Sequence, residues 1–321
     1  MHHNQNTSSR ISKVLDWIFV PYSLTVWRSF ETIVCIVMVY YFSSFLKTPD
    51  WWIGTSGYHV SARATSSGYL PPPPLIPDDW IHVVVVAFYF FSGMYILGYG
   101  RKVLNWVFFA FCMYVQAADQ PSAFTINRML ILYFFMFGLQ PESEPMEAIS
   151  IEASKDTSTQ TDTHAKVSGW MVRIMQLTLG LQYSASGICK IEGGWIKIQN
   201  DTIVFNSTVV WTQSQGHYKN ELAAWAVNDL PMFVWGSLAG ATLFFELFAI
   251  FLFFWTRTRL ATVIFGVCLH LGIAMLMKDL IYFSLQMLTM YIFFVPEKWV
   301  EDMVSGCRTF LQQLWRNKKD V

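Results

Sequence analysis

Eight stretches of this chain are apolar over enough residues to be considered as membrane-crossing helices. A bilayer needs about 20 consecutive, mostly apolar residues per helix, and backbone groups in lipid must satisfy one another, which favours helices. The third and fourth stretches are short, so a re-entrant pair is an alternative for them. We therefore expect an all-α, polytopic integral membrane protein with about eight transmembrane helices around one polar, outward-opening cavity. The stretches run roughly over residues 24–46, 80–98, 103–118, 124–139, 170–189, 232–255, 261–277 and 280–295.

The composition excludes several other classes of protein. Hydrophobic residues make up 54% of the chain and charged residues only 14%, whereas roughly 25% of residues are charged in globular proteins. A net charge of zero gives no bulk attraction to nucleic acid, and we expect none as a partner. The five cysteines form no CxxC pair, so we expect buried thiols, no metal site and no disulfide framework.

The basic residues suggest an orientation in the membrane. Most of them fall in alternate loops, on one side of the predicted helices, and the positive-inside rule then makes both termini cytosolic. The cytosolic loop over 141–168 is rich in acidic residues, Ser and Thr and is expected to be a flexible linker. One domain is expected over 1–300, followed by an amphipathic cytosolic tail over 301–321. The membrane would be the bacterial plasma membrane, or the endoplasmic reticulum in a eukaryote.

Two long loops are expected on the other side, over 47–79 and 192–231. The second loop contains two helical candidates, at 202–212 and 220–228, which would lie on the membrane surface. It also contains two glycosylation sequons, at Asn200 and Asn206, which have meaning only in a host that glycosylates secretory proteins.

The fifth stretch ends in Lys190, Glu192, two glycines and Trp195. A lysine at the edge of the hydrocarbon is costly to charge and can serve as a base. The alternative is a lysine that snorkels to the headgroups, and the residue chemistry alone leaves both open. Helical spacing places Tyr183 and Ser186 on the same stripe as Lys190.

Other ionisable residues in the apolar stretches are also functional candidates. Glu246 and His270 flank a predicted helical hairpin at similar depth, so they either form a base–orienter pair or a hydrogen bond that locks two helices together. Arg28 and Glu31 are three residues apart, and an ion pair that anchors the first helix explains them.

Four segments of the chain, in order, resemble the HTTM (horizontally transferred transmembrane) family, which includes the membrane part of vitamin K-dependent gamma-carboxylase. The resemblance spans about residues 11–299. The segments are Ser23-Leu-Thr-Val-Trp-Arg28-Ser-Phe, then Tyr183-Ser-Ala-Ser-Gly-Ile-Cys-Lys190-Ile-Glu-Gly-Gly-Trp195, then Glu246 with Arg257-Thr-Arg259, and lastly His270 with an aromatic final stretch that ends at Pro296.

The resemblance implies roles for these residues. Lys190 would be the base that deprotonates vitamin K hydroquinone, or menaquinol, on the extracytoplasmic side. Glu246 and His270 would complete the catalytic site. The residues implied in binding the cosubstrate are Tyr183, Ser186, Arg28 and Asn127, the last standing where the carboxylase has a functional histidine.

The family implies a quinol-dependent enzyme, gamma-carboxylase-like in chemistry, that modifies a secreted or exported peptide. The carboxylase carries a large lumenal domain after its last span, whereas this sequence continues for about 25 residues, so a full peptide carboxylase is not expected. The alternative is a non-catalytic membrane factor for maturation of, or immunity to, a secreted peptide. That role resembles the sporulation-delaying protein B group of the same family.

Overall fold

A computed structural model describes residues 12–13, 15–57, 74–118, 125–140, 166–199, 202–217, 220–277 and 280–317. The chain divides into two compact units. Unit 1 comprises Met1–Trp27 with Ser143–Val321, and unit 2 comprises Arg28–Glu142. The single domain that we expect over 1–300 stays a prediction.

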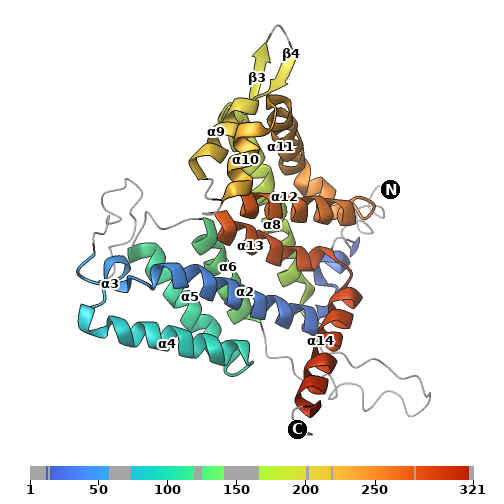
Figure 1. Cartoon of the computed structure of the whole chain (residues 1–321). Helices are drawn as coiled ribbons and strands as arrows, with labels where there is room; N and C mark the ends of the chain where they lie inside the picture. Colours follow the sequence, from blue (N-terminus) through green and yellow to red (C-terminus); the bar gives the residue numbers. More distant parts are fainter. Residues whose placement is uncertain are drawn as a thin grey trace, which may run out of the picture. The chain divides into compact units, whose positions relative to one another are not determined.

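Unit 2 is helical (Figure 1). Helix α5 packs against α6. Aromatic rings fill the space between the helices, and the centroid of the Phe108 ring lies 5.2 Å from that of Phe134 and 5.6 Å from that of Tyr95. The turn between α4 and α5 needs two glycines, because Gly98 and Gly100 have φ values of 92° and 62°. Its helices are α2 (Leu24–Phe45, which begins in unit 1), α3 (Pro49–Trp52), α4 (Asp78–Ile96), α5 (Arg101–Ala118) and α6 (Thr125–Leu139).

The described residues of unit 1 form helices and two small antiparallel sheets of two strands each. The β3–β4 hairpin follows α8 and projects from the end of this unit (Figure 1). The helices are α8 (Gly169–Glu192), α9 (Ser207–His217), α10 (Glu221–Asp229), α11 (Met232–Phe254), α12 (Arg259–Leu276), α13 (Ile281–Met290), the 3₁₀-helix η4 (Tyr291–Phe294) and α14 (Glu297–Asn317). The strand pairs are β1 (Tyr22–Ser23) with β2 (Lys166–Val167), and β3 (Ile196–Gln199) with β4 (Thr202–Phe205).

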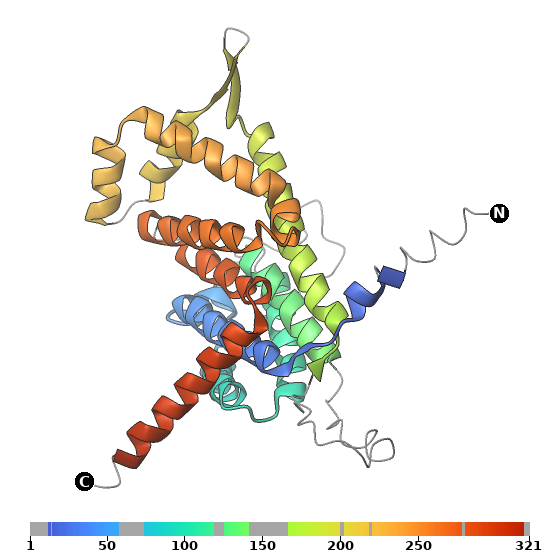
Figure 2. The same cartoon turned by 90° about the vertical axis from the view of Figure 1, so that its right-hand side faces the viewer.

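Helices α8 and α11 approach each other closely because two glycines lie between them. A Cβ atom added at Gly187 would lie 2.9 Å from the backbone nitrogen of Leu247, and one at Gly180 would lie 3.3 Å from Cα of Ile250. Small residues bring membrane helices together in this way. Figure 2 shows the C-terminal half of α11 crossing α8. The crossing therefore brings Lys190 of α8 and Glu246 of α11 face to face.

The predicted stretches all contain helix, but they differ in how well they suit a bilayer. Among the described residues, the four helices long and apolar enough to cross a membrane are α2, α4, α11 and α12. Helix α6 and the run from α13 through η4 are apolar but shorter. Helices α5 and α8 fall outside these groups because polar residues interrupt them. The chain is thus a multi-pass membrane protein, whereas eight spans and cytosolic termini stay predictions.

The loop after α8 differs from expectation. Residues 202–205 form strand β4 rather than the start of a helix, so α9 begins only at Ser207. The second helix predicted there is confirmed as α10. Asn206 is 9% exposed and its Nδ2 donates to the carbonyl of Gly194 at 2.9 Å, so the second sequon is engaged within the fold. Asn200 lies outside the described residues.

Three other expectations concern the linker, the tail and the cysteines. The expected linker over 141–168 lies outside the described residues except for its last three. Most of the expected tail lies in helix α14, and the N–H and Oγ of Ser23 donate to Glu297 and Glu301 near its start. Its cytosolic, amphipathic role stays a prediction. The prediction of buried thiols holds for Cys35 and Cys112 but is wrong for Cys189, Cys268 and Cys307, which face outward. In a membrane protein lipid, rather than protein, can cover such helix faces.

Candidate polar site of unit 1

Lys190 lies in the last turn of α8, and the chain reverses directly after it. The helix ends at Glu192, Gly193 caps it, and Gly194 takes a φ of 80° that favours glycine. This turn returns Trp195 to the helix end, where its backbone N–H donates to the carbonyl of Lys190 at 3.0 Å. The ammonium lies 4.9 Å from the centre of the Trp195 ring, within reach of a cation–π contact.

Lys190 forms an ion pair with Glu246 of α11. It also donates to Ser186 Oγ, one turn earlier on α8, at 3.4 Å. The side chain of Lys190 is 22% exposed and that of Glu246 is 7% exposed. Within the described residues, the second carboxylate oxygen, Glu246 Oε2, is buried without a hydrogen-bond partner. The pair is therefore buried on the Glu246 side and partly open on the Lys190 side.

A chain of three polar aromatic groups begins one turn before Ser186. The hydroxyl of Tyr183 lies 2.5 Å from Nε2 of His270 and 2.5 Å from the hydroxyl of Tyr291. All three residues are nearly fully buried. Nδ1 of His270 has no hydrogen-bond partner among the described residues. Because hydroxyl and imidazole groups both donate and accept, this chain can pass a proton along its length.

A glycine of α12 leaves space for the hydrogen-bonded groups of Tyr183, His270 and Tyr291. A Cβ atom on Gly266 of α12 would lie 2.2 Å from the Tyr291 hydroxyl oxygen. His270 follows Gly266 by one turn on the same helix. The rings of Phe245 and Phe253, both from α11, pack on the Tyr183 ring with centroids 5.0 and 6.0 Å away. Aromatic rings thus surround the Tyr183 hydroxyl and its two partners.

The expected pairing of Glu246 with His270 is wrong. Glu246 pairs with Lys190, and Nε2 of His270 contacts Tyr183. Their partners, Lys190 and Tyr183, lie about two turns apart on α8, so the two side chains do not meet at one level. Depth also does not fix the direction in which a side chain leaves a helix. Both residues face α8 instead of each other. The predicted stripe of Tyr183, Ser186 and Lys190 is confirmed by these contacts.

Two other predicted site residues belong to unit 2. Nη1 of Arg28 donates to Glu31 Oε2 at 2.7 Å, which confirms the predicted ion pair, and Arg101 shares the same oxygen at 3.2 Å. Asn127 is fully buried, and its Nδ2 donates to the carbonyl of Cys112 at 3.2 Å and to Gln116 Oε1 at 3.0 Å. The role of Arg28 and Asn127 in binding a cosubstrate stays a prediction.

Sequence reasoning missed three partners, namely Tyr291, Trp195 as a cation–π partner, and Arg101. Tyr291 is distant in sequence from Tyr183, and Arg101 from Glu31, so spacing carried no signal of these contacts. Trp195 is only five residues from Lys190, and the Gly193-Gly194 break already indicated a sharp reversal there.

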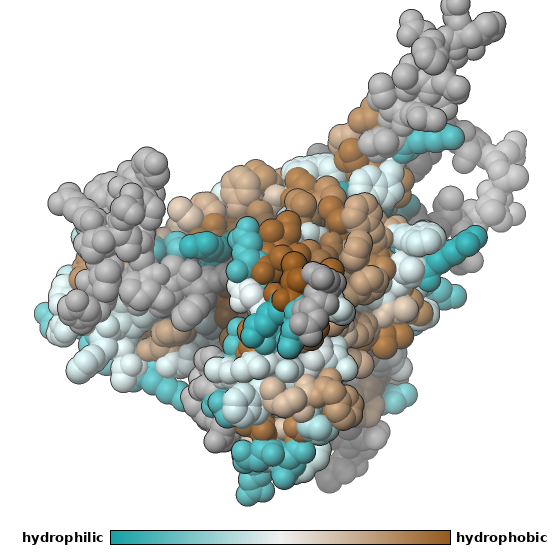
Figure 3. Space-filling view, turned by 90° about the horizontal axis from the view of Figure 1, so that it is seen from above, coloured by the Kyte–Doolittle hydropathy of each residue, from teal (hydrophilic) through white to brown (hydrophobic). Residues whose placement is uncertain are grey.

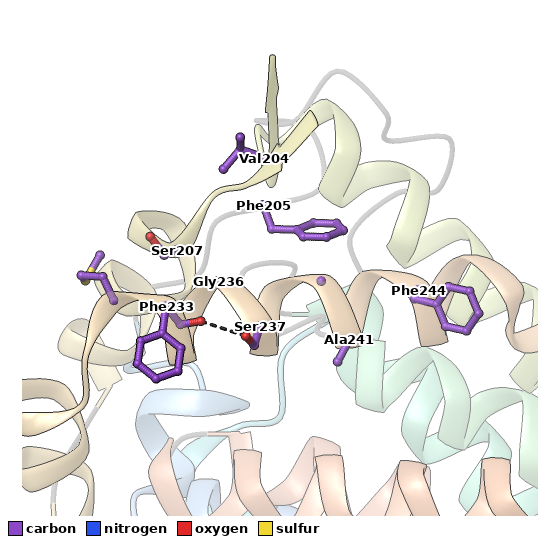
Figure 4. A pocket seen from close by; sticks show the side chains of 10 residues that line it. Val204, Phe205, Ser207, Phe233, Gly236, Ser237, Ala241 and Phe244 are labelled. Atoms are coloured by element: carbon purple, nitrogen blue, oxygen red, sulfur yellow. Dashed lines mark hydrogen bonds between the residues drawn. The ribbon is translucent and has the colours of Figure 1, made fainter. Parts of the chain in front are cut away.

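An open groove of about 730 Å³ lies along α11 and β4 (Figure 4). The Phe205 ring lies over Gly240, where a Cβ atom would come within 2.8 Å of it. Phe233 and Phe244 flank the groove. Figure 3, which looks onto this end of unit 1, shows hydrophobic side chains gathered there. The groove is apolar, and none of the polar site residues described above lines it.

A family model described as the HTTM domain matches residues 68–299, well over half of the chain. The matched range contains Lys190, Glu246 and His270 but begins after Arg28, so the resemblance at 23–30 lies outside it. No curated protein and no solved structure matches the chain.

Proposed function

The chain belongs to the HTTM domain family of multi-pass membrane proteins, which is related to the gamma-carboxylase, and we propose that it is an enzyme in which Lys190 acts as a base toward a lipid-soluble quinol. In this proposal the reaction serves to modify an exported peptide. The observation that carries it is the Lys190–Glu246 pair, held at a helix crossing beside the chain of Tyr183, His270 and Tyr291.

The buried polar atoms fit a hydroxyl-bearing ligand. Glu246 Oε2 and His270 Nδ1 are both buried without a partner among the described residues. Leaving such an atom unsatisfied costs about 1–3 kcal/mol, which a ligand hydroxyl would recover. Vitamin K hydroquinone or menaquinol, when bound, supplies both hydroxyl protons and reducing electrons. Glu246, Tyr183 and Ser186 would hold the hydroxyl end, with Trp195 beside them.

Lys190 must be neutral to accept a proton. Transfer of a proton from the Lys190 ammonium to Glu246 leaves an amine beside a carboxylic acid, and the pair as a whole remains uncharged. The lone pair of Nζ then takes a hydroxyl proton, so that one O–H bond breaks and one N–H bond forms. The Trp195 ring face favours the resulting ammonium. Tyr183 and His270 offer a route by which a proton can leave the site.

The test compares wild type with Lys190→Ala in purified, full-length protein. Removing a general base should slow oxidation of the quinol by dioxygen, the oxidant that this proposal requires, about 100-fold or more, while quinol binding is retained. Lys197→Ala is the matched control, because Lys197 is an exposed lysine of β3 and is not one of the polar site residues described above. Wild-type protein that binds no quinol, or a Lys190→Ala variant with full activity, would overturn the proposal.

A second candidate is a non-catalytic factor that binds a secreted peptide. The β3–β4 hairpin favours it, because Ile198 is 79% exposed and Ile203 is 67% exposed at the end of unit 1. Under this alternative, Lys190→Ala lowers the yield of folded protein without changing any reaction. Mass spectrometry of the co-expressed peptide separates the two, since only an enzyme leaves a covalent mass change.

A further inference from the structure

Helix α14 carries a stripe of apolar side chains that the described residues of unit 1 leave exposed. Trp299, Met303 and Phe310 are 55%, 58% and 59% exposed, and Cys307 is exposed as well. Because successive members of this set are three or four residues apart, they lie on one face of the helix, the apolar stripe. Figure 2 shows the later turns of α14 extending away from the other helices of unit 1. The stripe therefore needs an apolar partner other than these helices.

The opposite face of α14 is polar. Its members also recur every three or four residues, and they are Lys298, Glu301, Ser305, Arg308 and Gln312. A helix with one apolar and one polar face is stable where an apolar phase meets water. The two faces of α14 therefore suit the boundary of a bilayer.

The start of α14 lies at the level of such a boundary. Helices α11 and α12 are long and apolar enough to cross a membrane, so the turn between them, over 255–258, lies at a membrane surface. Phe254, the last residue of α11, has its ring centroid 5.8 Å from that of Trp17 and 6.1 Å from that of Phe294. Helix α14 begins three residues after Phe294. Figure 1 shows α14 running crosswise to α12 and α13, as a helix along that surface would.

The charge of the C-terminal sequence favours one kind of surface. The residues after Gly306 include four basic residues and one acid, namely Arg308, Arg316, Lys318, Lys319 and Asp320. Basic segments beside a membrane are attracted to anionic lipids. We propose that α14 lies in the surface of the bilayer that α11 and α12 cross, with the apolar stripe among the acyl chains and Arg308 toward anionic headgroups. This placement does not depend on the proposed reaction.

The test probes the surroundings of Cys307 in the full-length protein, held as single copies in lipid nanodiscs. A nitroxide label on Cys307, with Cys189→Ser and Cys268→Ser to remove the other exposed thiols, reports access to a water-soluble nickel complex and to lipid-soluble oxygen. The comparison label is attached through Ser305→Cys, with Cys307→Ser, on the polar face. We expect the label at 307 to be shielded from nickel and open to oxygen, and the label at 305 to show the reverse. Equal access at both positions would overturn the placement.

Two adjacent substitutions form a matched pair for the stripe. Phe310→Glu and Thr309→Glu add the same charge, and both native side chains are exposed, so neither change disturbs a packed core. Loss of the Phe310 ring from the bilayer should raise the ratio of exposed to immersed label on Cys307 about tenfold. Thr309→Glu should change this ratio little, and an equal effect of the two substitutions would contradict the assignment of the faces.

The lipid composition tests the partner of the helix. In phosphatidylglycerol, Arg308→Gln should raise the ratio of exposed to immersed label on Cys307 about fivefold, because each basic residue near an anionic surface contributes about that factor. In phosphatidylcholine it should have no effect. The control Lys197→Gln, at an exposed lysine of β3, should have none in either lipid. Equal immersion of the wild-type label in both lipids would overturn the anionic surface, and shielding that appears only when two copies share a nanodisc would assign the stripe to a second copy of the chain instead.

Discussion

The molecule holds two groups of charged residues on apolar helices, one in each unit, and they are built differently. In unit 1 one cation faces one carboxylate, and an oxygen of that carboxylate has no partner among the described residues. In unit 2 two arginines share one carboxylate, and Arg101 also contacts a backbone carbonyl and a hydroxyl. Among the described residues, the first group pairs its charges one to one and leaves one oxygen without a hydrogen-bond partner, whereas the second places two cations on one carboxylate oxygen.

The difference indicates what each group suits. A balanced pair with an unused acceptor, next to a chain of hydroxyl and imidazole groups, can move protons at little electrostatic cost. Two arginines that hydrogen bonds fix on one carboxylate cannot readily change protonation, so the second group suits a structural role. Charge in an apolar helix therefore does not by itself indicate catalysis. The balance of charges and the satisfaction of their hydrogen bonds distinguish the two.

The largest expected effect comes from Glu31→Gln. This substitution removes the charge that Arg28 and Arg101 share, and breaking a buried ion pair costs about 3–5 kcal/mol of unfolding free energy. Because Arg28 is partly exposed, we expect about 3 kcal/mol, measured by denaturant unfolding in detergent. The control is Asp79→Asn, an exposed acid of α4 in the same unit. A loss no larger than that of the control would mean that the arginines are held by other contacts.

The Lys190–Glu246 pair should instead tolerate removal of both charges. Lys190→Met alone leaves the buried Glu246 carboxylate, and Glu246→Met alone leaves the partly buried Lys190 ammonium, so each should lower the unfolding free energy by about 2–3 kcal/mol. The double variant should regain about 2 kcal/mol relative to the sum of the single changes. The full double-mutant cycle, measured by denaturant unfolding, gives this coupling energy directly. Simple additivity would contradict a direct interaction between the two side chains.

The course of the helices could largely be predicted from the sequence, because apolar runs of this length have few alternatives. The reversal after Lys190 could also be predicted, because Gly194 takes a φ of 80°, which glycine adopts readily and other residues do not. The β3–β4 hairpin was missed although its signal was present. Ile-Lys-Ile-Gln and Thr-Ile-Val-Phe flank Asn200-Asp201, and short β-rich runs around two turn-forming residues are typical of a hairpin.

The pairing of the polar residues could be predicted only in part. Contacts within a helix, such as those of Ser186 with Lys190 and of Arg28 with Glu31, follow from spacing alone. Contacts between helices depend on how each helix is rotated about its axis. That rotation is set at the α8–α11 crossing by Gly187, and a single sequence does not reveal which glycine faces a neighbour.

The chain of hydroxyl and imidazole groups should be sensitive to one added methyl group. Gly266→Ala forces the Tyr291 hydroxyl away, because the new Cβ would lie 2.2 Å from it. Overpacking of this kind costs about 1–3 kcal/mol, and we expect thermal unfolding to show a loss near 2 kcal/mol. The enzyme proposal adds a loss of quinol oxidation per folded molecule.

Gly272→Ala is the matched control for this change. It lies on the same helix, α12, and its added Cβ would meet nothing within 4 Å among the described residues. An alanine in a helix interior is favoured over glycine by roughly 0.5–1 kcal/mol, so this variant should be slightly more stable than wild type. Equal effects of the two substitutions would show that the Tyr291 hydroxyl does not occupy the space beside Gly266.

The smallest expected effect tests whether an unsatisfied acceptor alone marks a reactive site. Asn127 Oδ1 is buried without a partner among the described residues, as Glu246 Oε2 is, but its amide cannot titrate and its Nδ2 is bonded twice. Asn127→Ala should therefore lower the unfolding free energy by only about 1 kcal/mol, the usual worth of neutral hydrogen bonds. Asn105→Ala, which removes the acceptor of the Tyr95 hydroxyl in the same unit, should cost a similar amount. If Asn127→Ala matches instead the 2–3 kcal/mol expected for Glu246→Met, then hydrogen-bond satisfaction, and not charge balance, is what separates the two regions.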